Sequence, residues 1–170
     1  MPSYKNRQKL FFNQDRVEKK ILERARKNKQ IIYGARSIQA QIGIFSRPTQ
    51  DYDIFTKNPK GNANSIQKEL DKAVGFDYYY SKKGLNPGTY KVKSKGYDMK
   101  KGTEDDESVV DYTLLPNPRP PVKRIGGLLY RSLAQERSAK NRALRDKKFA
   151  FRHAKDREDV NRINLAKGPF

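Results

Sequence analysis

The chain has 170 residues, which is enough for one domain of ordinary size although 34% of the residues are charged. It contains no cysteine, which excludes a disulfide framework and any thiolate metal site. The N-terminus has no apolar run of signal-peptide length, and no stretch approaches the roughly 20 apolar residues of a membrane span. We therefore expect a soluble, intracellular and cytoplasmic protein that does not bind a membrane.

The net charge of +19 is concentrated at the two ends of the chain. Residues 1–30 carry ten Lys or Arg against three acids, residues 119–170 carry fifteen against five, and residues 31–118 carry thirteen against eleven. A localised basic surface attracts polyanions because their counterions are released on binding. The charge thus favours nucleic acid as a partner or substrate over a merely solvated surface, and it leaves a protein partner open.

Hydrophobic periodicity and turn residues predict alternating helices and strands. In chain order we expect a basic amphipathic helix over 6–29, a strand over 31–34, a helix over 36–42, a strand over 51–55, a helix over 62–73, strands over 76–81, 89–94 and 108–114, and helices over 125–145 and 146–166. Residues 95–107 read as an exposed loop. The pattern predicts an α/β core with a mixed sheet over 31–118, a basic helical arm over 1–30, and a C-terminal helical segment over 119–170 that packs on the core.

Three carboxylates stand out within the predicted strands. Asp51 and Asp53 lie two residues apart and so project from the same face, where their repulsion is relieved by a hard divalent cation such as Mg²⁺ or Mn²⁺. An exposed strand edge or a turn would give the same spacing. Asp111 lies in an apolar strand, a costly place for a carboxylate without a partner or a chemical role. We predict that it is a third metal ligand and a general base.

A strand-to-helix turn precedes these acids, in Tyr33-Gly34-Ala35-Arg36-Ser37. Small residues at such a turn let backbone N–H groups approach a phosphate at the N-terminus of the helix. The sequence therefore predicts that a triphosphate and a metal ion meet at one edge of the sheet.

Together these residues resemble the minimal nucleotidyltransferases of the DNA polymerase beta superfamily. The sequence is most similar to the abortive-infection-type nucleotidyltransferases, which include toxins of type IV toxin–antitoxin systems. The motifs that carry the resemblance are Gly34-Ala35-Arg36-Ser37, Arg47-Pro48-Thr49-Gln50-Asp51-Tyr52-Asp53 and the late Lys155-Asp156-Arg157-Glu158-Asp159. It covers residues 31 to 163, with alanine at position 35 where the family usually has glycine or serine.

The resemblance implies a nucleotidyltransferase core that moves a nucleoside monophosphate from a metal-bound nucleoside triphosphate to an acceptor. Asp51, Asp53 and Asp111 would be the catalytic and metal-binding residues. The implied nucleotide-binding residues are Gly34, Ala35, Arg36, Ser37, Arg47, Thr49 and Lys155. RNA, guided by the basic terminal helices, is the acceptor that the charge favours. The alternative is a non-catalytic, nucleic-acid-binding structural protein on the same fold, in an assembly such as a virion or a ribonucleoprotein.

Overall fold

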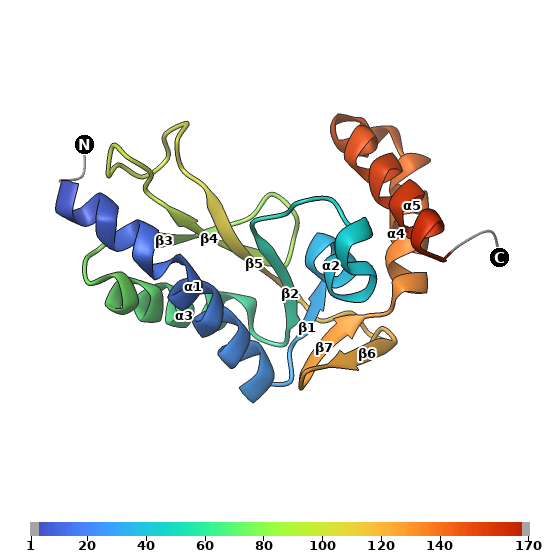
Figure 1. The fold of residues 1–170 in the computed structure, drawn as a ribbon, viewed down its shortest axis with the longest axis horizontal. Helices are drawn as coiled ribbons and strands as arrows, with labels where there is room; N and C mark the ends of the chain where they lie inside the picture. Colours follow the sequence, from blue (N-terminus) through green and yellow to red (C-terminus); the bar gives the residue numbers. More distant parts are fainter. Residues whose placement is uncertain (1–3, 168–170) are drawn as a thin grey trace.

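A mixed sheet runs through the molecule and joins segments that are far apart in the sequence (Figure 1). The computed structural model describes residues 4–167, with side chains from residue 14 onward. The strand order is β3-β4-β5-β2-β1-β7-β6. The strands are β1 (Ile31–Tyr33), β2 (Tyr52–Thr56), β3 (Tyr79–Lys83), β4 (Thr89–Ser94), β5 (Ser108–Leu114), β6 (Val122–Ile125) and β7 (Leu128–Arg131). Because β1–β7 and β2–β5 are parallel and the other pairs antiparallel, the expected α/β class with a mixed sheet is confirmed.

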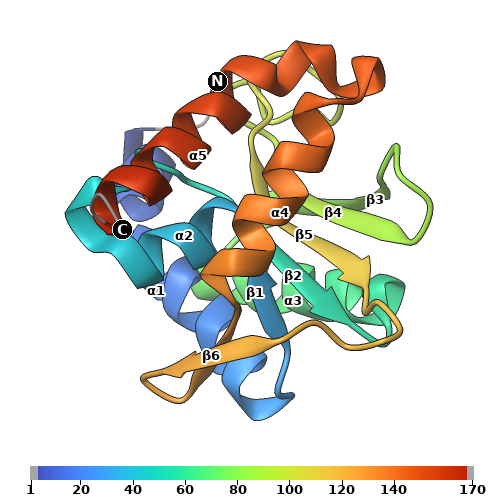
Figure 2. The same cartoon turned by 90° about the vertical axis from the view of Figure 1, so that its right-hand side faces the viewer.

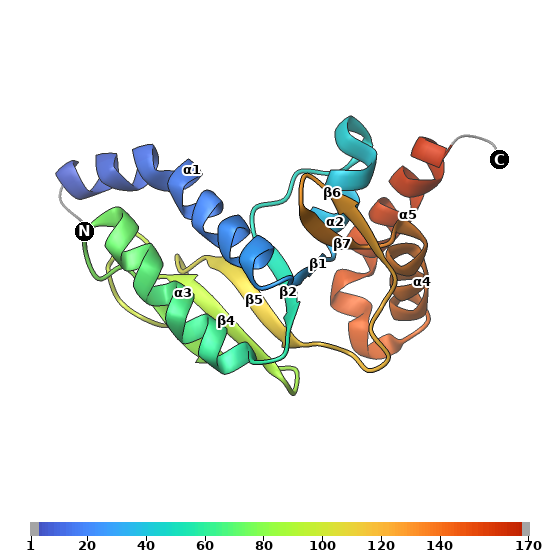
Figure 3. The same ribbon diagram turned by 90° about the horizontal axis from the view of Figure 1, so that it is seen from below.

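Two groups of helices lie on opposite faces of this sheet (Figures 2 and 3). One group is α1 (Tyr4–Lys27) and α3 (Pro59–Val74), which pack against each other. The other is α2 (Ala35–Ile42), η1 (Gly43–Phe45), α4 (Leu133–Leu144), η2 (Lys147–Arg152) and α5 (His153–Lys167). In Figure 2, β3 and β4 project to one side of α4, and no described helix covers their front face there.

The main core lies between the sheet and the pair α1–α3. Helix α1 contributes Val17, Ile21 and Ala25, whose spacing of four places them on one face of the helix. Helix α3 begins where the Asn58 side chain accepts a hydrogen bond from the backbone N–H of Gly61. Burial of each large aliphatic side chain stabilises the fold by roughly 1.5–3 kcal/mol. This packing holds one face of β2 against the core, so that the acids lie on its other face.

The region after residue 121 differs from the sequence expectation. A helix from residue 125 is wrong, because Val122–Ile125 and Leu128–Arg131 form a β-hairpin instead. Gly126 and Gly127 form its turn with φ of 57° and 78°, values that suit a two-residue hairpin turn and that glycine adopts readily. Strand β7 then pairs with β1, and α4 begins only at Leu133, where the Ser132 side chain caps it. None of the described helices combines the length and apolarity needed to cross a membrane.

Candidate active site

The structure places Asp53 and Asp111 side by side. They are direct partners in the parallel pairing of β2 with β5, so both side chains project from the sheet face that α4 approaches. Asp51 immediately precedes β2, two residues before Asp53. Two strands that are more than fifty residues apart in the sequence thus bring three carboxylates to one end of β2.

Asp53 is the electrostatic centre of this group. Burial, together with the nearby charges of Asp51 and Asp111, raises its pKa to about 7, while Lys140 and Arg152 act in the opposite direction. A carboxyl with this pKa is about half protonated at neutral pH. Since repulsion between carboxylates contributes to the shift, a divalent cation bound among them would stabilise the ionised form.

Asp111 already has two partners from its own surroundings. The Lys91 Nζ lies 2.9 Å from Asp111 Oδ2, and the Ser108 hydroxyl donates to Asp111 Oδ1 at 2.9 Å. Lys91 stands opposite Asp111 in the pairing of β4 with β5, so the strand register sets this contact. A cation that used Asp111 Oδ2 would have to displace the ammonium group.

The turn at Gly34 is held by two residues that the sequence did not single out. The Gly34 N–H donates to Glu136 Oε1 at 2.9 Å, and Arg131 binds both oxygens of Glu136, at 2.7 and 3.0 Å. Glu136 is fully buried, and the Arg131 guanidinium also lies over the Tyr33 ring at 5.2 Å. The Glu136 carboxylate therefore accepts the hydrogen bond that the Gly34 N–H could otherwise donate to a phosphate.

Gly34 also lies directly against Asp53. Its φ is +71°, and a Cβ at this position would lie 2.7 Å from Asp53 Oδ2. Gly34→Ala should therefore lower the free energy of unfolding by about 1–3 kcal/mol and displace the Asp53 carboxylate. Urea unfolding measures the loss. Gly43→Ala is the matched control, because Gly43 has φ +57° but nothing within 4 Å of its Cβ. Equal losses in both variants would contradict the contact with Asp53.

Two other residues of the turn make contacts within the protein. Ser37 is buried, and its hydroxyl donates to the carbonyl oxygen of Arg131 at 2.6 Å. The Arg36 guanidinium donates to the carbonyl oxygens of Gln50 at 2.8 Å and of Asp51 at 3.3 Å. In these positions Ser37 fixes α2 to the end of β7, and Arg36 holds the segment that carries Asp51.

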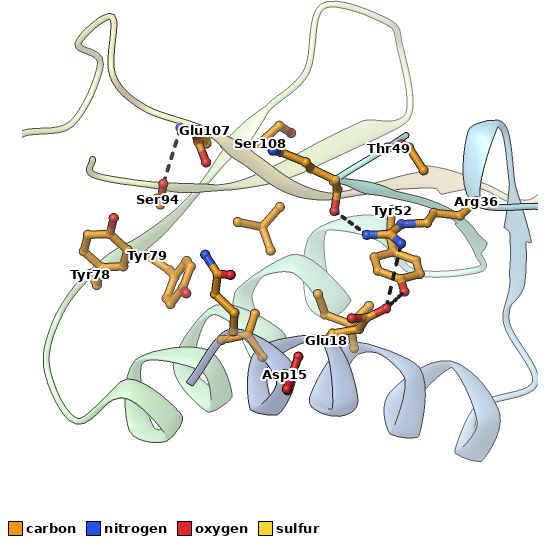
Figure 4. Close-up of a pocket in the computed structure, with 15 residues that line it drawn as sticks. Asp15, Glu18, Arg36, Thr49, Tyr52, Tyr78, Tyr79, Ser94, Glu107 and Ser108 are labelled. Atoms are coloured by element: carbon orange, nitrogen blue, oxygen red, sulfur yellow. Dashed lines mark hydrogen bonds and ion pairs between the residues drawn. The ribbon is translucent and has the colours of Figure 1, made fainter. Parts of the chain in front are cut away.

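A pocket of about 340 Å³ lies on the opposite face of β2 from Asp53, between α1 and the sheet (Figure 4). Arg36 and Thr49 line it together with Tyr52, whose ring lies 4.2 Å from the Arg36 guanidinium carbon. Glu18 of α1 accepts a hydrogen bond from the Tyr52 hydroxyl and lies 3.8 Å from Arg36. The structure thus separates Arg36 and Thr49 from the face that carries the acids.

The late motif forms a buried ion-pair network between α4 and α5. Lys140 of α4 lies 3.2 Å from both Asp156 and Asp159, and Arg47 binds both oxygens of Asp159 at 2.7 and 3.2 Å. Lys155, in contrast, is exposed on α5. Lys140, and not Lys155, is therefore the buried lysine of this network. Its charge lowers the pKa of the Asp53 carboxyl.

Another acidic group lies on the loop between β4 and β5. Among the described residues, only Asp98, Asp105 and Asp106 form a group whose ligand atoms all lie within 4.8 Å of one another; Asp51, Asp53 and Asp111 do not. Backbone N–H groups already donate to these oxygens, including Tyr97 to Asp105 at 2.6 Å and Gly102 to Asp106 at 2.7 Å. The group could take up a divalent cation, but the hydrogen bonds account for its geometry without one.

No family model and no curated protein matches the sequence. The structure, however, is similar to the polyadenylate synthase of Megavirus, with a TM-score of 0.71 over 92% of this chain at 13% identity. The chain has a nucleotidyltransferase fold. JHP933 from Helicobacter pylori is also similar, with a TM-score of 0.59, 14% identity, and coverage of 99% of this chain and 69% of that one. The chain spans about a third (32%) of the length of the Megavirus protein.

Proposed function

We propose that the protein transfers a nucleoside monophosphate from a nucleoside triphosphate to a hydroxyl of an acceptor, with RNA as that acceptor, and that it does so inside the cell. The observation that carries this proposal is the direct pairing of Asp53 with Asp111 next to the Gly34 turn. The same fold in a polyadenylate synthase supports it. At this level of identity the fold itself does not carry the activity over, so the acids have to be tested directly.

The proposed metal ligands are Asp51, Asp53 and Asp111. Their donor atoms are all oxygen and the pKa of Asp53 is raised in part by the other two acids, which fits Mg²⁺ or Mn²⁺. A bound divalent ion would neutralise charge on the reacting phosphates and orient them. For Asp111 to take part, Lys91 has to release Oδ2.

The proposed phosphate site is the N-terminus of α2. Since Glu136 occupies the Gly34 N–H, the first-turn amides of Ala35, Arg36 and Ser37 are the donors left for a phosphate. Lys140 and Arg152, whose charges act on Asp53, are placed to attract the triphosphate. Arg36 and Arg47 would then support the site by holding the Asp51 segment and α5, while nucleotide contacts by Thr49 and Lys155 remain predictions.

In the proposed reaction the acceptor hydroxyl oxygen bonds to the α-phosphorus. The bond from that phosphorus to the bridging oxygen of the β-phosphate breaks, and pyrophosphate leaves with the bonding electrons. The hydroxyl proton passes to Asp111, which lies beside Asp53. Membership of the abortive-infection-type group and guidance of RNA by the basic terminal helices also remain part of the proposal.

A transfer assay tests the function. The protein is incubated with each labelled nucleoside triphosphate in turn, Mg²⁺ or Mn²⁺, and total RNA, and label joined to RNA is measured. We expect incorporation with the wild type and none with Asp53→Asn. If RNA binds but no triphosphate is used under any of these conditions, the non-catalytic structural alternative holds instead.

A further inference from the structure

The face that carries the acids continues onto β4 and β3 as a basic surface. Lys82 of β3 stands opposite Lys91 of β4, Lys91 opposite Asp111 of β5, and Asp111 opposite Asp53 of β2. Neighbouring strands in a sheet are about 4.8 Å apart, so this is a straight row across four strands. Lys93 lies two residues along β4 from Lys91 and shares its face in the regular pairing of β4 with β3, although the register of β4 with β5 shifts between Val92 and Lys93. We call Lys82, Lys91 and Lys93 the lysine surface.

The charges of the lysine surface are not balanced within its own strands. β3 and β4 together contain Lys82, Lys83, Lys91 and Lys93 and no acidic residue. Like charges directly opposite each other on adjacent strands destabilise a sheet, and Lys82 faces Lys91 in this way. Of the three lysines of the lysine surface, Lys91 alone forms an ion pair with an acid of the described residues, Asp111. Such a surface is stabilised when an anion binds between the lysines.

The order of groups across the sheet indicates which anion this is. The Gly34 turn, where the triphosphate is proposed to bind, follows β1; the acids lie on β2 and β5; and the lysines lie on β4 and β3. In an in-line transfer, the attacking and leaving oxygens lie on opposite sides of the phosphorus. If pyrophosphate leaves on the β1 side, the acceptor reaches the acids from the side of β4.

We propose that the lysine surface binds the backbone of the acceptor, a single strand of nucleic acid whose terminal hydroxyl reaches Asp111. Lys82 and Lys91 form a row that ends at Asp111, with Lys93 beside it, so a phosphate backbone that follows this row would reach Asp111. In Figure 2 no described helix lies over β3 and β4 on this side. The role of the bound strand as the acceptor rests on the proposed function. The binding of the strand to the lysine surface does not.

Lys91 has a double role in this arrangement. Without a cation at Asp111, its ammonium group neutralises that carboxylate at 2.9 Å. A divalent cation at Asp111 would repel the ammonium group, which then turns to a phosphate of the acceptor. Metal loading at the acids thereby adds a third cation, beside Lys82 and Lys93, to the surface that holds the strand.

The surface differs from the site that net charge alone suggests. Most of the excess charge lies at the ends of the chain, and α1 belongs to the N-terminal part of it. However, α1 packs with α3 on the opposite face of the sheet from the lysine surface (Figure 3). A strand that ends at Asp111 would thus be held by the modestly charged middle of the chain, on the face of the sheet opposite to α1.

Charge reversal tests the inference with a matched control. Lys82→Glu/Lys93→Glu and Lys68→Glu/Lys72→Glu change the net charge equally, and Lys68 and Lys72 are exposed on α3, behind the sheet. Binding of a labelled 20-nucleotide RNA and of the DNA of the same sequence is measured by anisotropy at several salt concentrations, without nucleotide or metal. The first variant should lose affinity roughly tenfold or more and flatten the slope of log affinity against log salt by about 1.4, with both strands, because two single-strand phosphate contacts are lost.

The control variant should keep its salt slope and most of its affinity. Equal losses in the two variants would overturn the inference, since they would mean that net charge and not this surface sets the binding. If Lys82→Glu/Lys93→Glu unfolds, which circular dichroism detects, Lys82→Gln/Lys93→Gln replaces it with the same comparison. Binding of Mn²⁺ with a nucleoside triphosphate is measured separately on wild type and Asp53→Asn. Its failure would remove the proposed function and leave the result for the lysine surface unchanged.

Discussion

Asp111→Asn is expected to lower kcat for nucleotide transfer by about a thousandfold, within the range that loss of a positioned proton acceptor produces. The amide keeps the shape of the side chain and can still accept the hydrogen bond from Ser108. It cannot remove the acceptor proton or attract a cation with a full charge. Because the Gly34 turn and Lys140 are untouched, the Michaelis constant for the triphosphate should change only a few-fold.

The matched control for this variant is Asp77→Asn. Asp77 also pairs with a lysine, Lys95 at 3.0 Å, but it is exposed, with 79% of its side chain accessible, and lies outside the site. Initial rates over a series of triphosphate concentrations separate kcat from the Michaelis constant. Wild-type turnover by Asp111→Asn would remove Asp111 from the chemistry. A large rise in the Michaelis constant at unchanged kcat would make it a binding residue only.

The sequence was informative about the acids themselves. A spacing of two predicts a shared face for Asp51 and Asp53, and an isolated acid in an apolar strand drew attention to Asp111. The sequence could not show that β2 and β5 are neighbours, because parallel pairing over a long connection depends on how the whole sheet assembles. The register that sets Lys91 against Asp111 depends on the same assembly.

The partners of the Gly34 turn could not be predicted. Glu136 is 102 residues from Gly34 along the chain, and in the sequence it is an ordinary acid inside the helix predicted over 125–145. Arg131 lies inside the helix predicted over 125–145, although in the structure it ends β7. The apolar run around Gly126 and Gly127 fits both a buried helix and a hairpin, and only the positive φ of both glycines decides between them.

Motif residues were the hardest to assign by role. An arginine at a motif position that suggests a nucleotide contact can equally well bind a carboxylate or a carbonyl oxygen of the protein, because its guanidinium N–H groups donate to both. In this structure Arg36 and Arg47 bind Asp51, Gln50 and Asp159. The late lysine of the motif is exposed, whereas Lys140, which belongs to no motif, is buried between two aspartates. The spacing of residues in the sequence identifies important positions, but it does not predict which groups each side chain contacts.

Asp53→Asn should make the protein more stable, and the gain should depend on pH. Burial, together with Asp51 and Asp111, raises the pKa of Asp53 from 3.8 to about 7 in the folded protein. The folded state therefore holds this proton more tightly than the unfolded state does. Between about pH 4 and pH 7 the unfolded chain has lost the proton and the folded chain keeps it, so the contribution of Asp53 to stability falls as the pH rises.

Above pH 7 the penalty from Asp53 is complete, and the rise of its pKa from 3.8 to about 7 corresponds to at most about 4 kcal/mol. Asn has no charge to bury, so Asp53→Asn should raise the free energy of unfolding by up to that amount at pH 8 and by little at pH 4. Urea unfolding in the presence of a chelator measures both. The difference between wild type and variant is the quantity to compare, because the other titrating groups contribute equally to the two proteins.

Adding Mn²⁺ should reverse the order at pH 8. A cation among Asp51, Asp53 and Asp111 stabilises the folded wild type by an amount that grows with metal concentration, and Asp53→Asn, with one ligand charge missing, should gain much less. Near pH 6, where Asp53 is still mostly protonated, metal uptake by the wild type should release close to one proton, which calorimetry in buffers of different ionisation enthalpy detects. A stability difference that stays the same at pH 4 and pH 8 would show that Asp53 ionises normally. In that case the three acids are not close enough to share a cation, and the metal site has to be sought elsewhere on the chain.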